Sequence, residues 1–136
     1  MYLENSKTIV VKIGSSLIIN DKKIIRKKWL VEFAKDIKAL RKKNKNIIVV
    51  SSGAIALGCK KLNISKKKLK IDQSQAVASI GQIELMNLFK EVFANQKINI
   101  SQLLLTLEDT EIRRRAINAK RTIENLFYLN FIPIVN

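Results

Sequence analysis

The stretch that decides the fold lies near the amino terminus and reads Thr8-Ile9-Val10-Val11-Lys12-Ile13-Gly14-Ser15-Ser16. An apolar run rich in β-branched residues is typical of a buried strand, and the glycine and serines that follow end it. Gly14 permits close approach of a ligand, and the N–H groups of Gly14, Ser15 and Ser16 can together bind an anion. Lys12 adds a positive charge, so the stretch predicts a phosphate-binding turn. The alternative is that Lys12 only extends from a strand end into solvent.

A second strand with a similar ending follows, because the apolar residues 47–50 lead into Ser51-Ser52-Gly53. A helical pattern then runs from Ala54 to about Leu62. The free N–H groups and the dipole of a helix amino terminus attract anions, and the small residues Gly53 and Ala54 leave room for a ligand. Ser52 can also be a simple helix N-cap, which is the alternative interpretation.

Helices and strands alternate along the rest of the chain. We expect helices over about 26–43, 72–95 and 111–130, strands over 102–106 and 131–135, and a short edge strand over 17–19. In the long helix that starts at Asp72, Gln75 is expected to complete a capping box. The connections are long enough for right-handed parallel crossovers, and the strands are apolar on both faces. The sequence therefore predicts an α/β fold, a three-layer α/β/α sandwich with a mainly parallel sheet.

Polar residues follow three of the predicted strands, at Lys12–Ser16, Ser51–Ala54 and Asn136. Parallel sheets bind ligands at the carboxyl ends of their strands. We therefore expect these three turns to lie at one edge of the sheet and to bind a negatively charged small molecule together.

The composition describes a single globular domain of 136 residues, with 47% hydrophobic and 27% charged residues. Its apolar runs are far shorter than the roughly 18–20 residues of a membrane span, and the amino terminus lacks the layout of a signal peptide. The single cysteine, Cys59, excludes an intramolecular disulfide. These features favour a cytoplasmic protein with no membrane partner.

The net charge of +15 raises the possibility of nucleic-acid binding. The basic residues are nevertheless spread over helix faces and loops, and the aromatic residues lie among apolar neighbours instead of between basic ones. No specific nucleic-acid partner is expected, although a non-catalytic basic binding module remains an alternative of another class.

Three motifs carry a resemblance to a known family: Val10–Ser16, Val50–Gly58 and Pro133–Asn136. Together they resemble the amino acid kinase family, and within it the members that phosphorylate L-glutamate. The element Ser52-Gly53-Ala54-Ile55-Ala56-Leu57-Gly58 is the most specific part, and Gln82 after Gly81 also matches. The resemblance covers essentially all 136 residues, in order.

The resemblance implies transfer of the γ-phosphoryl group of ATP to the side-chain carboxylate of L-glutamate, the first step of proline biosynthesis, with Mg²⁺ bridging the nucleotide phosphates. It implies that Lys12 is catalytic and stabilises the transferring phosphoryl group, and that Gly14 and Ser15 contact the phosphates. It also implies that Ser52, Gly53, Ala54 and Asn136 bind the substrate. The chain has no histidine, but a carboxylate that is already ionised at pH 7 needs no general base.

The family pattern continues beyond Pro133–Asn136 into an acidic segment and a nucleotide-binding half, which this sequence does not contain. Residues 1–136 are therefore expected to be the amino-terminal, substrate-side portion of the kinase domain, inactive alone and a homo-oligomer when full length. The alternatives are the kinase portion of a bifunctional proline-pathway synthase and another member of the family.

Overall fold

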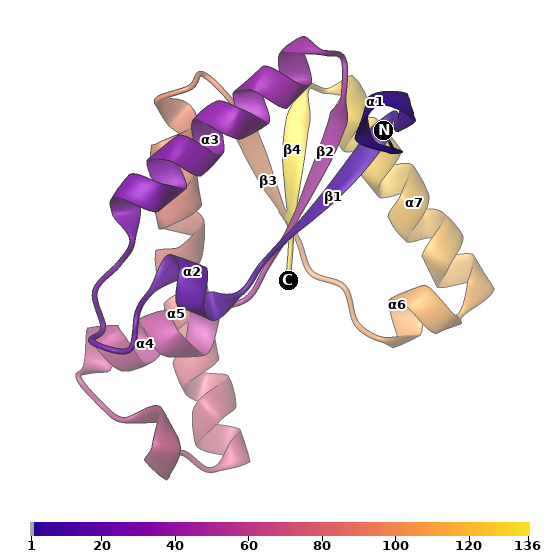
Figure 1. Ribbon diagram of the computed structural model, residues 1–136. Coiled ribbons are helices and arrows are strands. Elements are labelled where there is room, and N and C mark those ends of the chain that lie inside the picture. Colours follow the sequence, from indigo (N-terminus) through magenta and orange to yellow (C-terminus); the bar gives the residue numbers. More distant parts are fainter. Residues whose placement is uncertain (1) are drawn as a thin grey trace.

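The computed structural model describes residues 2–136 and has the predicted α/β alternation (Figure 1). Its elements are α1 (Tyr2–Asn5), β1 (Thr8–Ile13), α2 (Ser15–Ile18), α3 (Lys27–Lys42), β2 (Asn46–Ser51), α4 (Ala54–Leu62), the 3-10 turn η1 (Lys66–Lys68), α5 (Ile71–Ala94), β3 (Asn99–Leu103), α6 (Glu108–Glu111), α7 (Arg113–Tyr128) and β4 (Phe131–Val135). No helix within this part of the chain is both long enough and apolar enough to cross a bilayer.

The four strands form one parallel sheet in the order β1-β2-β4-β3, which confirms the predicted fold class. One row of the register runs across the whole sheet and joins Lys12, Val50, Val135 and Leu103. The turns after β1, β2 and β4 therefore leave the sheet at the same edge, which we call the carboxyl edge.

One face of the sheet carries the hydrophobic core, and α3, α4 and α5 lie on that side in Figure 1. Leu30 and Ile37 of α3 and Leu85 and Phe89 of α5 are each no more than 2% exposed. Their helical spacing places them on one side of their helices, opposite the charged residues. This face, which we call the inner face, contains most of the buried apolar residues of the chain.

The opposite, outer face lies towards α7 and the short α6 and is only partly closed. No residue of α7 is buried, and Val10 of β1 remains 60% exposed. A groove of about 570 Å³ lies between α6, α7 and the beginnings of β1 and β2. The helices thus lie on both sides of the sheet as predicted, but the outer layer does not reach over β1.

Two strand predictions were wrong. Residues 17–19 were expected to be extended, but Leu17 and Ile18 belong to α2, where the N–H groups of Leu17 and Ile19 donate to the carbonyls of Gly14 and Ser15. This helical turn places Ile18 in the core with none of its surface exposed. Ile19, the last of the three, is extended and forms an isolated antiparallel bridge with Ile25. The strand expected over 102–106 lies earlier, at Asn99–Leu103, because its partner β4 ends beside Leu103.

The start of α5 also differs from the prediction. The helix begins at Ile71, and its first-turn amide cap is Gln73, whose Oε1 accepts from the Lys70 backbone N–H at 3.0 Å. Gln75 was the wrong capping partner because the N-cap is Lys70, two residues before Asp72, which makes Gln73 the third residue of the helix.

Candidate functional site

The three predicted turns converge on one pocket of about 270 Å³ at the carboxyl edge of the sheet. It is lined by Ser15 from the first turn, by Ser52, Gly53, Ala54, Ile55 and Ala56 from the second turn and the start of α4, by Asn136 after β4, and by Lys66 and Ala78. We call this cavity the carboxyl-edge pocket. Among the predicted site residues, it brings together Ser15, Ser52, Gly53, Ala54 and Asn136.

The first two turns touch one another, and Gly53 makes this contact possible. Gly53 has a φ of +124°, a conformation that side chains disfavour, and a Cβ there would lie 3.3 Å from Ile18 Cδ1 and 3.7 Å from the Ser15 Cα. The Ser52 N–H also donates to the Ile13 carbonyl at 3.2 Å. The backbone on either side of the pocket is therefore held in one arrangement.

The start of α4 is held in place by α5 through two glycines. A Cβ on Gly81 would lie 1.7 Å from the Ala54 carbonyl oxygen, and a Cβ on Gly58 would lie 2.2 Å from that of Val77. Neither distance is possible for a side chain, so only glycine allows the helices to pack this closely. Gly81, which precedes Gln82 in the family pattern, thus has a packing role next to the pocket.

Asn136 closes the third side of the pocket and is fixed by three hydrogen bonds. Its backbone N–H donates to the Leu103 carbonyl at 3.1 Å, and its carbonyl accepts from the Leu105 N–H at 3.3 Å. Its side-chain Nδ2 donates to Gln82 Oε1 on α5 at 2.5 Å. The Gln82 Nε2 is shielded from solvent and has no hydrogen-bond partner among the described residues.

Lys12 and Gly14 belong to the same edge of the sheet but do not line the pocket. Lys12 is exposed on the outer face, and within residues 2–136 no hydrogen bond or ion pair is found for its ammonium group. Gly14 has a φ of −73°, and a Cβ there would meet nothing nearer than 4.0 Å. The backbone itself therefore does not require glycine at position 14.

Lys66 was not predicted as a site residue, although it is the only charged residue that lines the carboxyl-edge pocket in the described part of the chain. It lies in η1, within a basic segment that shows no periodicity. Nothing in a run of three lysines indicates which one will face a pocket, so the sequence carried no usable signal.

The titratable groups with shifted pKa values lie outside the pocket. Hydrogen bonds from the backbone and side chain of Thr106 lower the pKa of Asp109, and burial lowers the pKa of Arg41. In residues 2–136 no cluster of three or more histidine, cysteine, aspartate or glutamate side chains could hold a metal ion.

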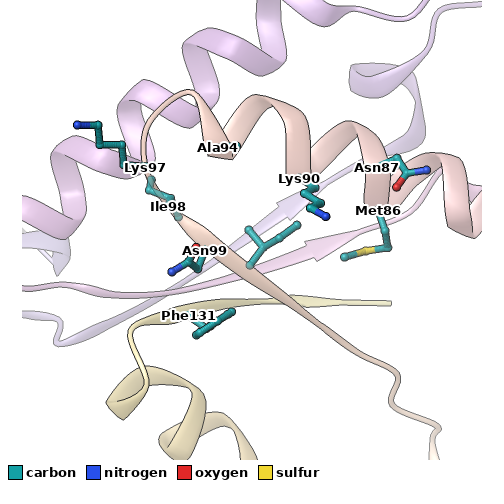
Figure 2. Close-up of a pocket in the computed structure, with 9 residues that line it drawn as sticks. Met86, Asn87, Lys90, Ala94, Lys97, Ile98, Asn99 and Phe131 are labelled. Carbon is teal, nitrogen blue, oxygen red and sulfur yellow. The ribbon is translucent and has the colours of Figure 1, made fainter.

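A larger cavity of about 490 Å³ lies away from the predicted residues (Figure 2). Met86, Asn87 and Lys90 line it from α5, Asn99 from β3, and Phe131 from β4. Because Asn99 and Phe131 begin their strands, this cavity lies at the opposite edge of the sheet from the carboxyl-edge pocket. Parallel sheets bind ligands at the carboxyl ends of their strands, so we take the smaller pocket as the candidate site.

Comparison with known proteins gives concordant results. The model of the amino acid kinase family matches residues 7–136. The chain is 76% identical over 136 residues to the glutamate 5-kinase of Pelagibacter ubique (strain HTCC1062), covering all of this chain and 37% of the relative. It is 43% identical over 135 residues to the glutamate 5-kinase of Ruegeria sp. (strain TM1040), covering 98% of this chain and 37% of the relative.

The fold is also similar to a solved carbamate kinase from Giardia, with a TM-score of 0.61 at 11% identity. The similarity covers 96% of this chain and 59% of that one. The chain thus spans little more than a third of the length of the curated relatives it matches, and all of its predicted site residues lie within the matched region.

Proposed function

The chain belongs to the amino acid kinase family, and on this premise we propose that it forms the substrate-binding portion of an enzyme that phosphorylates L-glutamate with ATP. The observation that carries the proposal is the convergence of three separate turns on the carboxyl-edge pocket. The names of the relatives at 76% and 43% identity support L-glutamate as the substrate. The proposed product is L-glutamyl 5-phosphate, which enters proline biosynthesis.

The proposed reaction needs no base from this chain. A glutamate side chain has a pKa of about 4.3, so its carboxylate is ionised at pH 7. One of its oxygens forms a bond to the γ-phosphorus of ATP, and the bond between that phosphorus and the β–γ bridging oxygen breaks. ADP leaves with the electron pair, and no proton is transferred. Such a transfer depends on positioning and charge stabilisation, which agrees with a pocket that lacks histidine.

The size of the pocket supports separate binding places for glutamate and ATP. Its volume of about 270 Å³ is below the range of about 300–1,000 Å³ that is usual for drug-sized ligands. We assign glutamate to this pocket, with Ser52, Gly53, Ala54 and Asn136 around it. ATP is assigned to the neighbouring outer side of the same edge, where Lys12 would stabilise the transferring phosphoryl group and Gly14 and Ser15 would contact the phosphates.

The remaining parts of the proposal concern the whole protein. The part of the chain that the structure describes offers no metal cluster, so no step is assigned to Mg²⁺ here. Residues 1–136 are proposed to be the amino-terminal portion of the kinase domain, with the nucleotide-binding half outside them. Assembly into a homo-oligomer and a cytoplasmic location also stay predictions for the full-length protein.

A chimera tests the proposed function. Residues 1–136 of this chain would replace the matching residues of the Pelagibacter ubique glutamate 5-kinase, to which they are 76% identical. We expect glutamate-dependent release of ADP from the chimera and none from the 136-residue chain alone. L-Aspartate, which is one methylene shorter, should be a much poorer substrate. A chimera that folds but shows no glutamate-dependent ADP release would refute the proposal.

A further inference from the structure

We propose that Gln82 is a positioning residue for the substrate, because it holds the Asn136 side chain so that its oxygen, Oδ1, is presented to the substrate ammonium group. This inference rests on the proposed function and adds an assignment for the amino group of the substrate. It begins from the side-chain hydrogen bond that joins α5 to the residue after β4, between Asn136 Nδ2 and Gln82 Oε1 at 2.5 Å.

The hydrogen bonds of Asn136 leave one strong acceptor available. An asparagine side chain has one acceptor oxygen and two N–H donors. The backbone of Asn136 is already paired with Leu103 and Leu105, and its Nδ2 is paired with Gln82. The side chain is exposed and lines the carboxyl-edge pocket. Oδ1 is therefore the atom that can accept a hydrogen bond from a ligand.

The ligand group that fits this atom is an ammonium group, which can only donate. A flipped Asn136 amide would instead present N–H groups to a positively charged donor, which is unfavourable. The same pocket offers the positively charged Lys66 and the N–H groups at the start of α4 to carboxylates. An acceptor oxygen held in a fixed orientation, together with these donors, matches an amino acid better than a dicarboxylic acid without an amino group.

The packing of α5 next to the pocket fixes the position of Gln82. It follows Gly81, whose missing side chain allows α5 to lie directly against the carbonyl of Ala54. It also lies four residues after the pocket residue Ala78, hence on the same side of the helix. The amide of Gln82 is therefore fixed next to the pocket, where it can hold the Asn136 side chain in position through its hydrogen bond.

Stability alone does not account for a glutamine at this position. The Gln82 Nε2 is shielded from solvent and unpaired among the described residues, and a buried donor without a partner is destabilising. An apolar side chain of similar shape, such as methionine, would remove that unpaired donor. We therefore expect a methionine to be tolerated by the fold and to impair only the recognition of the substrate.

The experiment compares two ligands in the chimera described above. Activity of the unsubstituted chimera with glutamate is measured first, because its absence would refute the proposed function and not this inference. For Gln82→Met we expect the KM for L-glutamate to rise about tenfold, with kcat changed less than about twofold. The inhibition constant of glutarate, which lacks the ammonium group, should stay the same, and so should the melting temperature.

Two further variants complete the test. Gln75→Met, an exposed glutamine on the same helix, is the matched control and should leave both constants unchanged. In an Asn136→Ala background, Gln82→Met should add less than about a twofold change, because one residue acts through the other. Equal shifts for glutamate and glutarate, additive effects in the double variant, or an unchanged KM for Gln82→Met would each overturn the inference.

Discussion

The two faces of the sheet are built from similar apolar strands but are closed to very different degrees. On the inner face, α3 and α5 bury large side chains completely, whereas on the outer face no residue of α7 is buried and Val10 is 60% exposed. The inner face therefore provides most of the stability of this chain. The outer face and the carboxyl edge carry the groups assigned to substrates. Function and stability should respond to different substitutions.

The largest expected effect comes from the same substitution on the two faces. Phe89 of α5 is fully buried, and Phe127 of α7 is only partly buried. Phe89→Ala should lower the free energy of unfolding by about 3–5 kcal/mol. Phe127→Ala should lower it by only about 1 kcal/mol, because less apolar surface leaves water there. Urea denaturation measures both, and equal losses would mean that the two faces contribute alike.

Substitution of Lys12, on the outer face, should impair function without changing stability. Its side chain is exposed and makes no hydrogen bond or ion pair within residues 2–136. Lys12→Met in the chimera should lower kcat about 10²- to 10³-fold, the usual loss when one group that stabilises transition-state charge is removed. The urea midpoint should not move. Retention of most of the kcat would remove Lys12 from the catalytic assignment.

Gly81 and Gly14 form a second matched pair, one at a helix contact and one at an open turn. A Cβ on Gly81 would lie 1.7 Å from the Ala54 carbonyl oxygen, whereas the nearest atom to a Cβ on Gly14 would be Ser16 Oγ, at 4.0 Å. Gly81→Ala should cost about 1–3 kcal/mol of stability through overpacking and raise the KM for glutamate. Gly14→Ala should leave the melting temperature nearly unchanged. A stable Gly81→Ala variant would contradict the close contact of α4 and α5.

A smaller effect is expected at Lys66, which is exposed although it lines the pocket. Lys66→Gln should raise the KM for glutamate about threefold, because a solvent-screened charge contributes at most about 1 kcal/mol. Lys67→Gln, its neighbour outside the pocket lining, is the control and should have no effect. If both variants behave alike, general attraction by the basic turn explains the change.

The smallest expected effect is a pH dependence near the outer groove, where Asp109 accepts hydrogen bonds from the Thr106 backbone and side chain. These bonds lower the pKa of Asp109 in the folded state. The stabilisation they provide is present above the unfolded-state pKa and is lost as the pH falls through the folded-state pKa. Thr106→Ala removes one of the two bonds, so the carboxyl pKa measured by NMR titration should rise partway towards its ordinary value.

Most of the fold could be predicted because its signals are local. Apolar β-branched runs marked β1, β2 and β4, and helical spacing marked α3 and α4. The short α2 could not be predicted from Leu17–Ile19, because an apolar triplet suits a strand as well as a buried helical turn. The position of β3 depends on where β4 ends, which is a tertiary property.

The candidate site was predictable to the extent that it follows from strand order. Ser15, Ser52 and Asn136 each follow a strand, so a parallel sheet brings them to one edge. Lys66 enters the pocket from a separate turn, and Gln82 contacts Asn136 across 54 positions of sequence. Neither contact leaves a periodic pattern, so neither could be inferred without the structure.

The most direct test of the central claim is a crystal structure of the chimera with L-glutamate bound. The account predicts density for the amino acid in the carboxyl-edge pocket, between the Ser52–Ala54 backbone and the Asn136 side chain. Density for glutamate in the cavity beside Lys90 and Asn99, or elsewhere on the chimera with the carboxyl-edge pocket empty, would contradict it.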